Sequence, residues 1–479
     1  MIMFVVEFVA FFLLFWITPI HSSVFRSTVR DSSSLRFVQM IHTHGDRTPS
    51  QFVANDPFNA VEIFWPEGVG QLTEKGKERM LKIGEFFKPI YQDFVARNLN
   101  KTNLEQFVRI RSSAYRRCLQ SAALFSTGLF GGGRQQPINN TYQSKFIDEY
   151  NFLMKIWTPV PIISYRPKAM DPILDADFDC PNVQKGFLQI RQQDLRVRDS
   201  LRKYRQFFDE ISFFTGEHID SLEKMNNLYK ELYIEQQHNY HWWQWPYEIW
   251  SKNFDRLAIE QSREISKLYW SYYYDSSLIQ RLIGGELIKK INKNFRRFLN
   301  ESDENHHHRE RFTIFSTHDG KIVVLLKALG IDIDDYLVDP GTVFIIELHQ
   351  NASSYYLKFF LYNESITKES IRKYLLQEIF PKKFCLQQQQ QQQRSKSLWT
   401  SESSSSSSTF CSIEEFLEYS QQFEPIDIEY ECGLKHSKLT EKVNRMLWIS
   451  NAFLATCLIA LLGYVLIVNK FTRHHIKLL

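Results

Sequence analysis

The chain has 479 residues and carries 58 Lys and Arg against 54 Asp and Glu, so its formal net charge at pH 7 is only +4. Nucleic-acid-binding domains are usually much more basic, so this charge balance argues against a nucleic-acid partner. With 43% hydrophobic and 15% aromatic residues, the chain can bury at least one large core, which excludes disorder along its whole length.

The two ends of the chain differ from the segment between them. The apolar run 8–17, followed by a polar stretch, is typical of a signal peptide, which we predict over residues 1–23. Near the other end, residues 447–468 carry no charge and are numerous enough to cross a membrane as one helix. We therefore predict a lumenal or extracellular segment over 24–446, a transmembrane helix, and a cytoplasmic tail over 469–479.

Sequons and cysteines favour this orientation. Lys and Arg flank the apolar run on both sides, so the positive-inside rule does not decide it. The long segment before the run contains five acceptors for N-glycosylation, at Asn100, Asn139, Asn300, Asn351 and Asn363. Four of its cysteines are candidates for disulfides, in any of three pairings: Cys180, Cys385, Cys411 and Cys432. We predict a single-pass type I membrane protein of the lysosomal or endosomal lumen or the cell surface.

A strand, a polar turn and a helix follow one another three times in the long segment. The strands that begin these units are predicted at 35–42, 107–111 and 312–316, and the helices near 80–87, 115–125 and 321–329. Residues 342–348 and 355–361 then resemble an antiparallel strand pair. We expect an α/β fold with a mostly parallel central sheet and helices on both faces. Ligands bind beyond the carboxyl ends of strands in such sheets, so the three polar turns could share one crevice.

The pattern changes between about 150 and 300, where long polar helices are rich in aromatic residues. We interpret this region as an inserted helical cap over the crevice. Its tryptophans, such as Trp245, are expected to pack in the core of the cap, with a substrate-contacting wall as the alternative. The Gln- and Ser-rich stretch 386–409 cannot build a core and is predicted to be a disordered loop.

The three polar turns carry the residue types that phosphoryl transfer needs. His44 is a candidate nucleophile, because a neutral imidazole can attack phosphorus without like-charge repulsion. Arg47 and Arg117 are candidate clamps, since a guanidinium donates two hydrogen bonds to phosphate oxygens. His318 adds a further donor, and Asp319 could protonate the departing oxygen if an adjacent anion keeps it neutral.

The same residues carry a family resemblance. His44-Gly45-Asp46-Arg47-Thr48-Pro49 resembles the H-G-x-R-x-P signature of the histidine acid phosphatases, and Thr317-His318-Asp319 is similar to their late His-Asp element. Residues 65–73 and 111–122 are similar to segments of the lysosomal and prostatic branch of that family. The resemblance spans roughly residues 36–435.

This resemblance implies an acid phosphatase that hydrolyses phosphate monoesters without a metal or other cofactor. It assigns a role to each candidate: phosphohistidine nucleophile for His44, phosphate contacts for Arg47, Arg117 and His318, and proton donor for Asp319. It also implies disulfides that pair Cys180 with Cys432 and Cys385 with Cys411.

One position departs from the family pattern. An arginine normally precedes the nucleophile, and this chain has Thr43. Loss of one preorganised charge donor costs about 3 kcal/mol, on the order of a hundredfold in rate. Arg116 is a candidate to compensate. Two alternatives stay open: a catalytically impaired membrane ectodomain that binds phosphate or phosphoinositides, and a mutase-like phosphotransferase.

Overall fold

The computed structural model of the protein describes most of the long segment and the apolar helix. The described residues are 33–99, 104–131, 160–167, 170–240, 244–250, 256–300, 310–331, 337–352, 354–363, 376–381, 383–385, 411–434 and 438–476. The predicted signal peptide, 1–23, and the predicted Gln- and Ser-rich loop, 386–409, lie outside these residues.

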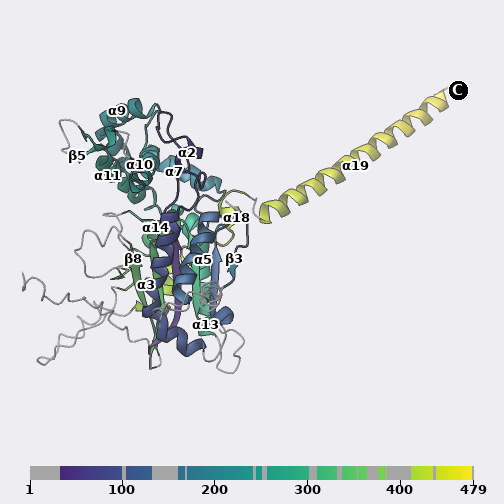
Figure 1. Ribbon diagram of the computed structural model, residues 1–479. Coiled ribbons are helices and arrows are strands. Elements are labelled where there is room, and N and C mark those ends of the chain that lie inside the picture. Colours follow the sequence, from purple (N-terminus) through teal and green to yellow (C-terminus); the bar gives the residue numbers. More distant parts are fainter. Residues whose placement is uncertain are drawn as a thin grey trace, which may run out of the picture.

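One mixed sheet forms the centre of the described chain (Figure 1). Its order is β10, β8, β7, β1, β6, β2 and β3, with β9 also paired to β8. Strands β1, β6, β2 and β3 run parallel, and β7 returns antiparallel beside β1. The strands are β1 Leu35–Thr43, β2 Val108–Ser112, β3 Ile162–Ile163, β6 Phe312–Thr317, β7 Val343–Asn351, β8 Ser354–Tyr362, β9 Gln377–Ile379 and β10 Cys411–Ser412. The predicted α/β fold is confirmed, and the predicted antiparallel pair is β7 and β8.

Helices cover both faces of this sheet. Side chains alternate along β1, so Val38 and Met40 join the core under α3 and α5, while Phe37 and Ile41 join the core on the other face. That second core is completed by α13, α14 and α17. These five helices are α3 Glu74–Leu99, α5 Arg116–Phe130, α13 Gly285–Leu299, α14 Asp319–Ala328 and α17 Ile413–Gln421.

A second group of helices lies above the sheet at the carboxyl ends of its parallel strands (Figure 1). This cap comprises α7 Pro181–Gln193, α8 Leu195–Lys203, α9 Arg205–Thr215, α10 Leu222–Gln237 and α11 Ala258–Tyr273. Trp245 is buried there and its ring stacks on Phe214 at a centroid distance of 5.7 Å, which fits the core-packing interpretation.

We expected the cap to extend to about residue 300, but the observed cap ends before helix α13. Helix α13 packs on the sheet instead, where Asn294 donates to the side-chain oxygen of Gln39 at 2.8 Å. The Gln39 amide in turn donates to the carbonyl of Ile291 at 3.2 Å.

The shorter elements are α2 Val61–Phe64, α4 Leu104–Phe107, η1 Trp245–Tyr247, β4 Ile249–Trp250, β5 Arg256–Leu257, α12 Ser277–Ile279, the π-helix η2 Gln280–Gly284 and α18 Ile428–Glu431.

Two disulfides close the fold, with the pairing that the resemblance implied. Cys180, at the start of α7, pairs with Cys432 after α18, across 252 positions of sequence. Cys385 pairs with Cys411 across 26 positions. Cys118 is a free and buried thiol in α5.

One predicted glycosylation acceptor is wrong. Asn363 is only 1% exposed, and its amide accepts from the backbone of Asp339 and donates to the carbonyl of Leu337. A side chain so enclosed has no room for a glycan. The sequons at Asn100 and Asn139 lie outside the described residues.

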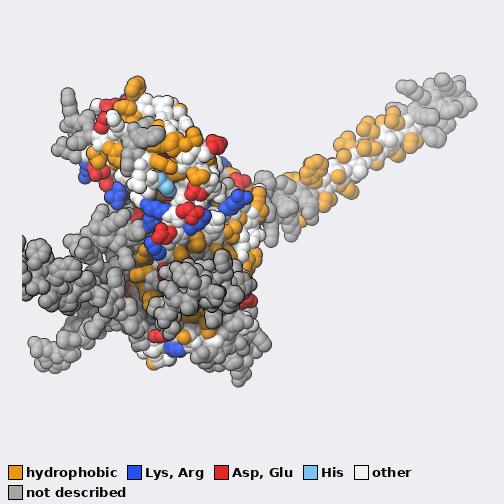
Figure 2. Space-filling view, viewed as in Figure 1, with side chains coloured by type: hydrophobic (Ala, Val, Ile, Leu, Met, Phe, Trp, Pro, Cys, Tyr) orange, Lys and Arg blue, Asp and Glu red, His pale blue; other side chains and the backbone are white. Residues whose placement is uncertain are grey.

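A single long helix, α19 Lys438–Ile476, ends the described chain and extends away from the body (Figure 1). Within the part of the chain that the structure describes, it contains one candidate membrane span, Met446–Val468, by length and composition. Its large apolar side chains are exposed, for example Trp448 at 78% and Ile459 at 69%, and Figure 2 shows them along the helix. This span covers the predicted residues 447–468.

Helices α3 and α5 pack unusually closely because glycines face one another at their contact. A Cβ atom added at Gly84 would lie 2.2 Å from the backbone oxygen of Phe125, and one added at Gly128 would lie 2.2 Å from that of Leu81. Both obstacles are backbone atoms, so neither can move without shifting a whole helix. This contact fixes α5, which carries Arg117.

We predict that Gly84→Ala lowers the free energy of unfolding by about 1–3 kcal/mol, because the new methyl group overpacks the contact. Helix propensity alone predicts the opposite sign, a gain of about 1 kcal/mol. Urea titration of the detergent-solubilised protein measures the change, with Glu85→Ala at an exposed neighbouring position as control. A more stable Gly84→Ala protein would contradict the prediction.

Candidate active site

The parallel pairing of β1 and β6 places two histidines side by side. Thr43 lies opposite Thr317 in the register, so His44 and His318 both follow the last paired residues of their strands. Their rings meet edge to face with centroids 5.7 Å apart. Ser112 lies opposite Ser316 on the other side of β6, which brings the start of α5 to the same edge.

Glycine makes the turn after β1 possible. A Cβ atom at Gly45 would lie 2.5 Å from the backbone oxygen of Gly76, so only glycine fits against the first turn of α3. The Gly45 N–H donates to the hydroxyl of Ser121 in α5 at 3.1 Å. Both contacts hold the backbone that carries His44.

The hydrogen bond of His44 leaves one of its two ring nitrogens with a lone pair. Its Nδ1 lies 2.9 Å from the carbonyl of Gly45, and a carbonyl can only accept, so Nδ1 carries the proton and Nε2 keeps a lone pair. Burial, with the charges of Arg117 and Arg47, holds the pKa of His44 well below its usual range. The ring therefore stays neutral in acidic solution.

Two arginines stand beside His44. Burial and the Arg117 charge lower the pKa of Arg47 to about 10, which leaves it charged in neutral and acidic solution. The Arg117 guanidinium lies 4.4 Å from the ring centroid of Tyr115 and donates to the carbonyl of Gly70 at 3.3 Å. This arrangement aims two cations at the edge of the sheet where His44 lies.

His318 is held by residues to which we assigned no role from sequence. Its Nε2 lies 3.2 Å from the hydroxyl of Ser113, which itself donates to Asp175 at 2.5 Å. Its Nδ1 lies 3.4 Å from Arg117 and can accept from that guanidinium. Burial and Arg117 lower the pKa of His318 to about 3, so the ring is neutral. In this arrangement His318 also positions Arg117.

Asp319 begins helix α14 and is paired with a lysine from the cap. One carboxylate oxygen accepts from the N–H of Gly320 at 2.8 Å, and the other lies 2.7 Å from Nζ of Lys230. Burial alone would raise the pKa of Asp319, but the charges of Lys230 and Arg47 outweigh it and hold the pKa well below the usual range. With these neighbours the carboxyl group is an anion.

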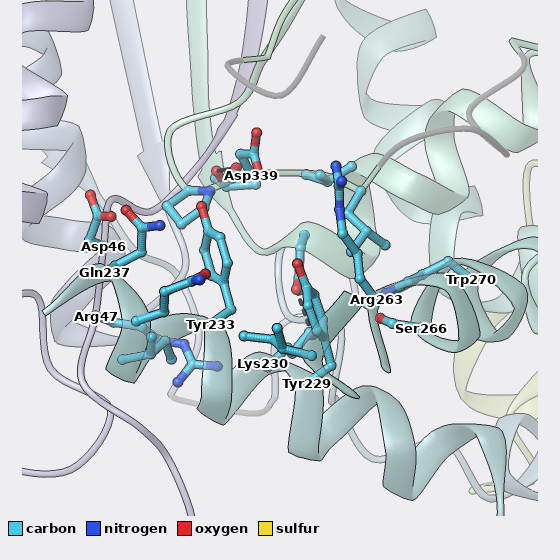
Figure 3. Close-up of a pocket in the computed structure, with 18 of the residues that line it drawn as sticks. Asp46, Arg47, Tyr229, Lys230, Tyr233, Gln237, Arg263, Ser266, Trp270 and Asp339 are labelled. Carbon is cyan, nitrogen blue, oxygen red and sulfur yellow. Dashed lines mark hydrogen bonds and ion pairs between the residues drawn. The ribbon is translucent and has the colours of Figure 1, made fainter. Parts of the chain in front are cut away.

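A cavity of about 400 Å³ opens between the cap and these sheet ends. Figure 3 shows Arg47 on one side and Trp270 on the other, with Lys230 between them on α10. Three of the predicted residues, His44, Arg47 and Asp319, line the cavity. Arg117 and His318 are not among the lining residues, and they contact each other.

Thr43 also borders this cavity, whereas Arg116, the candidate to compensate for it, does not. The Thr43 hydroxyl donates to the backbone oxygen of Asp339 at 3.3 Å. Arg116 is exposed at the start of α5 and is not among the lining residues. Among the described residues, no group of three or more His, Cys, Asp or Glu side chains could hold a metal ion.

Comparison with known sequences gives one clear family. The family model described as "Histidine phosphatase superfamily (branch 2)" matches residues 34–362. Human lysosomal acid phosphatase is 28% identical over 334 residues, which cover 69% of this chain and 71% of that protein. Rat prostatic acid phosphatase is 26% identical over 340 residues, which cover 70% and 80% of the two chains.

Solved structures show the same fold at low identity. A phytase of Citrobacter braakii is 13% identical with a TM-score of 0.53, and the match covers 83% of this chain and 99% of that chain. A Hafnia alvei phytase in complex with tartrate is 12% identical with a TM-score of 0.55, and the match covers 83% of this chain and 98% of that chain. At these identities the likeness shows the fold alone.

A cluster of buried carboxyl groups lies on the same cap helix as Lys230. Glu231 and Glu235, one turn apart on α10, are 4% and 2% exposed, and Asp56 is 3% exposed. Burial, with the charge of Asp56, raises the pKa of Glu231 to about 8 and that of Glu235 to about 9. Burial also raises the pKa of Asp56. The folded protein therefore keeps protons here that the unfolded chain loses.

We predict that this cluster makes the fold more stable in acid. A raised pKa in the folded state contributes stability that is complete below pH 4.5 and is lost as the pH rises through 8 to 9. Between pH 5 and pH 8 the loss should be about 3–4 kcal/mol for each of the two glutamates. Thermal unfolding of the protein at both values measures it. Glu235→Gln should reduce the difference, whereas Glu223→Gln, exposed on the same helix, should not. Equal pH dependence in all three proteins would refute the prediction.

Proposed function

Because the chain belongs to the histidine phosphatase superfamily (branch 2) and is a phosphatase, we propose that it hydrolyses phosphate monoesters through a phosphohistidine on His44. One observation carries this proposal above the others. The bond from Nδ1 of His44 to the Gly45 carbonyl leaves Nε2 unprotonated, and the low pKa keeps it so in acid. A neutral imidazole beside two arginines is suited to attack an anionic phosphoryl group.

The first step transfers the phosphoryl group to the protein. Nε2 of His44 attacks phosphorus, and the bond to the ester oxygen breaks as Asp319 gives its proton to that oxygen. Arg47 and Arg117 hold the phosphoryl oxygens and offset the charge that develops on them. The products are the free alcohol, the Asp319 carboxylate and phosphohistidine.

The second step returns the enzyme to its starting state. Water attacks phosphorus, the Asp319 carboxylate takes a proton from that water, and inorganic phosphate leaves as His44 becomes neutral again. Every proton in this route is carried by a side chain or by water. We therefore expect activity to persist in the presence of a chelator.

An acidic pH meets the requirements of both His44 and Asp319 in this mechanism. His44 must be neutral, and burial with the neighbouring cations keeps its pKa low enough for that. Asp319 must hold a proton when the alcohol leaves, and the negative charge of a bound phosphate raises the pKa of a nearby carboxyl group. Low pH supplies that proton without protonating His44, which supports an acid phosphatase.

We also propose that α19 crosses a membrane and that the phosphatase body faces the lysosomal or endosomal lumen or the cell exterior. The exposed apolar side chains of Met446–Val468 support the crossing. Two disulfides support a body outside the cytosol, because disulfides persist in oxidising compartments. No observation favours a phosphate-binding protein without turnover, or a phosphotransferase, over this proposal.

We expect His44→Ala to lower kcat on 4-nitrophenyl phosphate at pH 5 by at least about a thousandfold, because the proposed route has no covalent intermediate without the His44 imidazole. His218→Ala, with an exposed side chain on the cap, should leave kcat unchanged. The assay is run on the detergent-solubilised protein with a chelator present. Activity retained by His44→Ala, or lost to the chelator, would overturn the proposed mechanism.

We expect Asp319→Asn to discriminate between leaving groups. An amide cannot donate the missing proton, so hydrolysis of an alkyl phosphate should fall about 100- to 10,000-fold. Nitrophenolate leaves without protonation, so hydrolysis of 4-nitrophenyl phosphate should fall much less. The ratio of kcat/KM for the two substrates tests this, and an equal loss on both would remove Asp319 from the role of acid.

A further inference from the structure

We propose that Lys230 is a further phosphate-binding residue, delivered to the site by the cap. Its Nζ lies 2.7 Å from an oxygen of Asp319 and lines the cavity with His44 and Arg47. When a phosphate monoester enters, the ammonium group leaves Asp319 and binds a phosphoryl oxygen. This inference rests on the proposed function, because it adds a cation to the same site.

The surroundings of the ion pair allow this exchange. The side chains of Lys230 and Asp319 are 29% and 34% exposed, so both face the cavity and neither is locked inside the core. Ion pairs that water can reach are weakly held. The Lys230 ammonium also lies 4.7 Å from the ring centroid of Trp270, whose face attracts cations. Trp270 therefore keeps the ammonium in the cavity when the carboxylate releases it.

The site needs another cation at this point. Thr43, which borders the same cavity, carries no charge, and its hydroxyl donates to the backbone oxygen of Asp339. Arg117 and Arg47 lie close enough to His44 to lower its pKa, but neither comes from the cap. Lys230 approaches from α10 and lies between Arg47 and Trp270 in Figure 3, so it reaches the cavity from a different element than the two arginines and can bind a further phosphoryl oxygen.

The exchange links substrate binding to the proton that the reaction requires. While Lys230 holds Asp319, that carboxylate is stabilised as an anion and is a poor acid. Transfer of the ammonium to the phosphate frees the oxygen, which then takes one proton from the acidic solution. Lys230 keeps all its protons throughout. The substrate charge thus turns Asp319 from a base into an acid.

Several groups face Asp319, and the test must allow for all of them. They are Lys230 from α10, His44 and Arg47 from the turn after β1, His318 beside it, and Tyr274 after α11. Of these, His44 and His318 are neutral and Tyr274 stays protonated. Lys230 and Arg47 are therefore the cations that set the charge of Asp319, and Lys230 is the one in direct contact.

The experiment compares Lys230→Met and Lys230→Arg with Lys224→Met in the full-length protein. Methionine keeps the length of the side chain without its charge, and arginine restores the charge. Lys224 lies on the same helix, but its ammonium pairs with Asp220 outside the cavity. Thermal unfolding at pH 5 confirms that each variant is folded. Lys230→Gln replaces Lys230→Met if the methionine variant is not.

The first readout is the binding of inorganic phosphate at pH 5, measured by calorimetry. Loss of one charge-assisted hydrogen bond should weaken it about 10- to 100-fold in Lys230→Met. Lys230→Arg should stay within a few-fold of the natural protein, and Lys224→Met should match it. Unchanged phosphate affinity in Lys230→Met would overturn the inference.

The second readout is the pH dependence of kcat/KM, which a merely structural role would not move. Lys230 lowers the pKa of Asp319, so its removal should shift the alkaline limb of the profile to higher pH. A limb at the same pH in Lys230→Met and the natural protein would count against the exchange. Phosphate binding does not need turnover. A protein that binds phosphate through Lys230 but has no activity would refute the proposed function and leave this contact standing.

Discussion

The parallel pairing of β1 with β6 is the constraint on which the site depends. Thr43 lies opposite Thr317, so the next residue of each strand, His44 and His318, emerges at the same height on the same edge of the sheet. A shift of one residue in this register would turn one strand's side chains to the other face and separate the two rings. Both faces of β1 are buried under helices, which makes any other register costly.

Charge is the second constraint, because the site gathers cations around His44, which the proposed mechanism requires to be uncharged. Burial and the neighbouring arginines keep both histidine rings neutral, and these same arginines are the groups that would bind phosphate. In the proposed mechanism, each arginine would therefore bind the phosphate and also keep His44 neutral. The same cations lower the pKa of Asp319 and so disfavour its protonated form. A phosphate dianion would reverse that effect, so the site is complete only together with its substrate.

The sequence predicted the features that depend on local patterns and missed those that depend on the cap. Alternating strands followed by polar turns were enough to predict the central sheet, and the structure brings together five residues chosen from those turns. Lys230 was not predicted as a site residue, because it lies on a polar helix and only the folded cap brings it to Asp319. Asp175 was not predicted as a site residue either, yet it supports His318 through Ser113. The sequon at Asn363 misled because local sequence does not show burial.

The disulfide between Cys385 and Cys411 affects how the folded body would respond to proteolytic cleavage. The two cysteines bracket a low-complexity stretch of the chain, and they stay bonded whether or not that stretch is continuous. A cut between them would leave β8 and α17, on either side, joined by a covalent bond. The larger loop closed by Cys180 and Cys432 retains its pieces in the same way. Nicked molecules would therefore keep their size until they are reduced, and the body could be cleaved in a degradative compartment without coming apart.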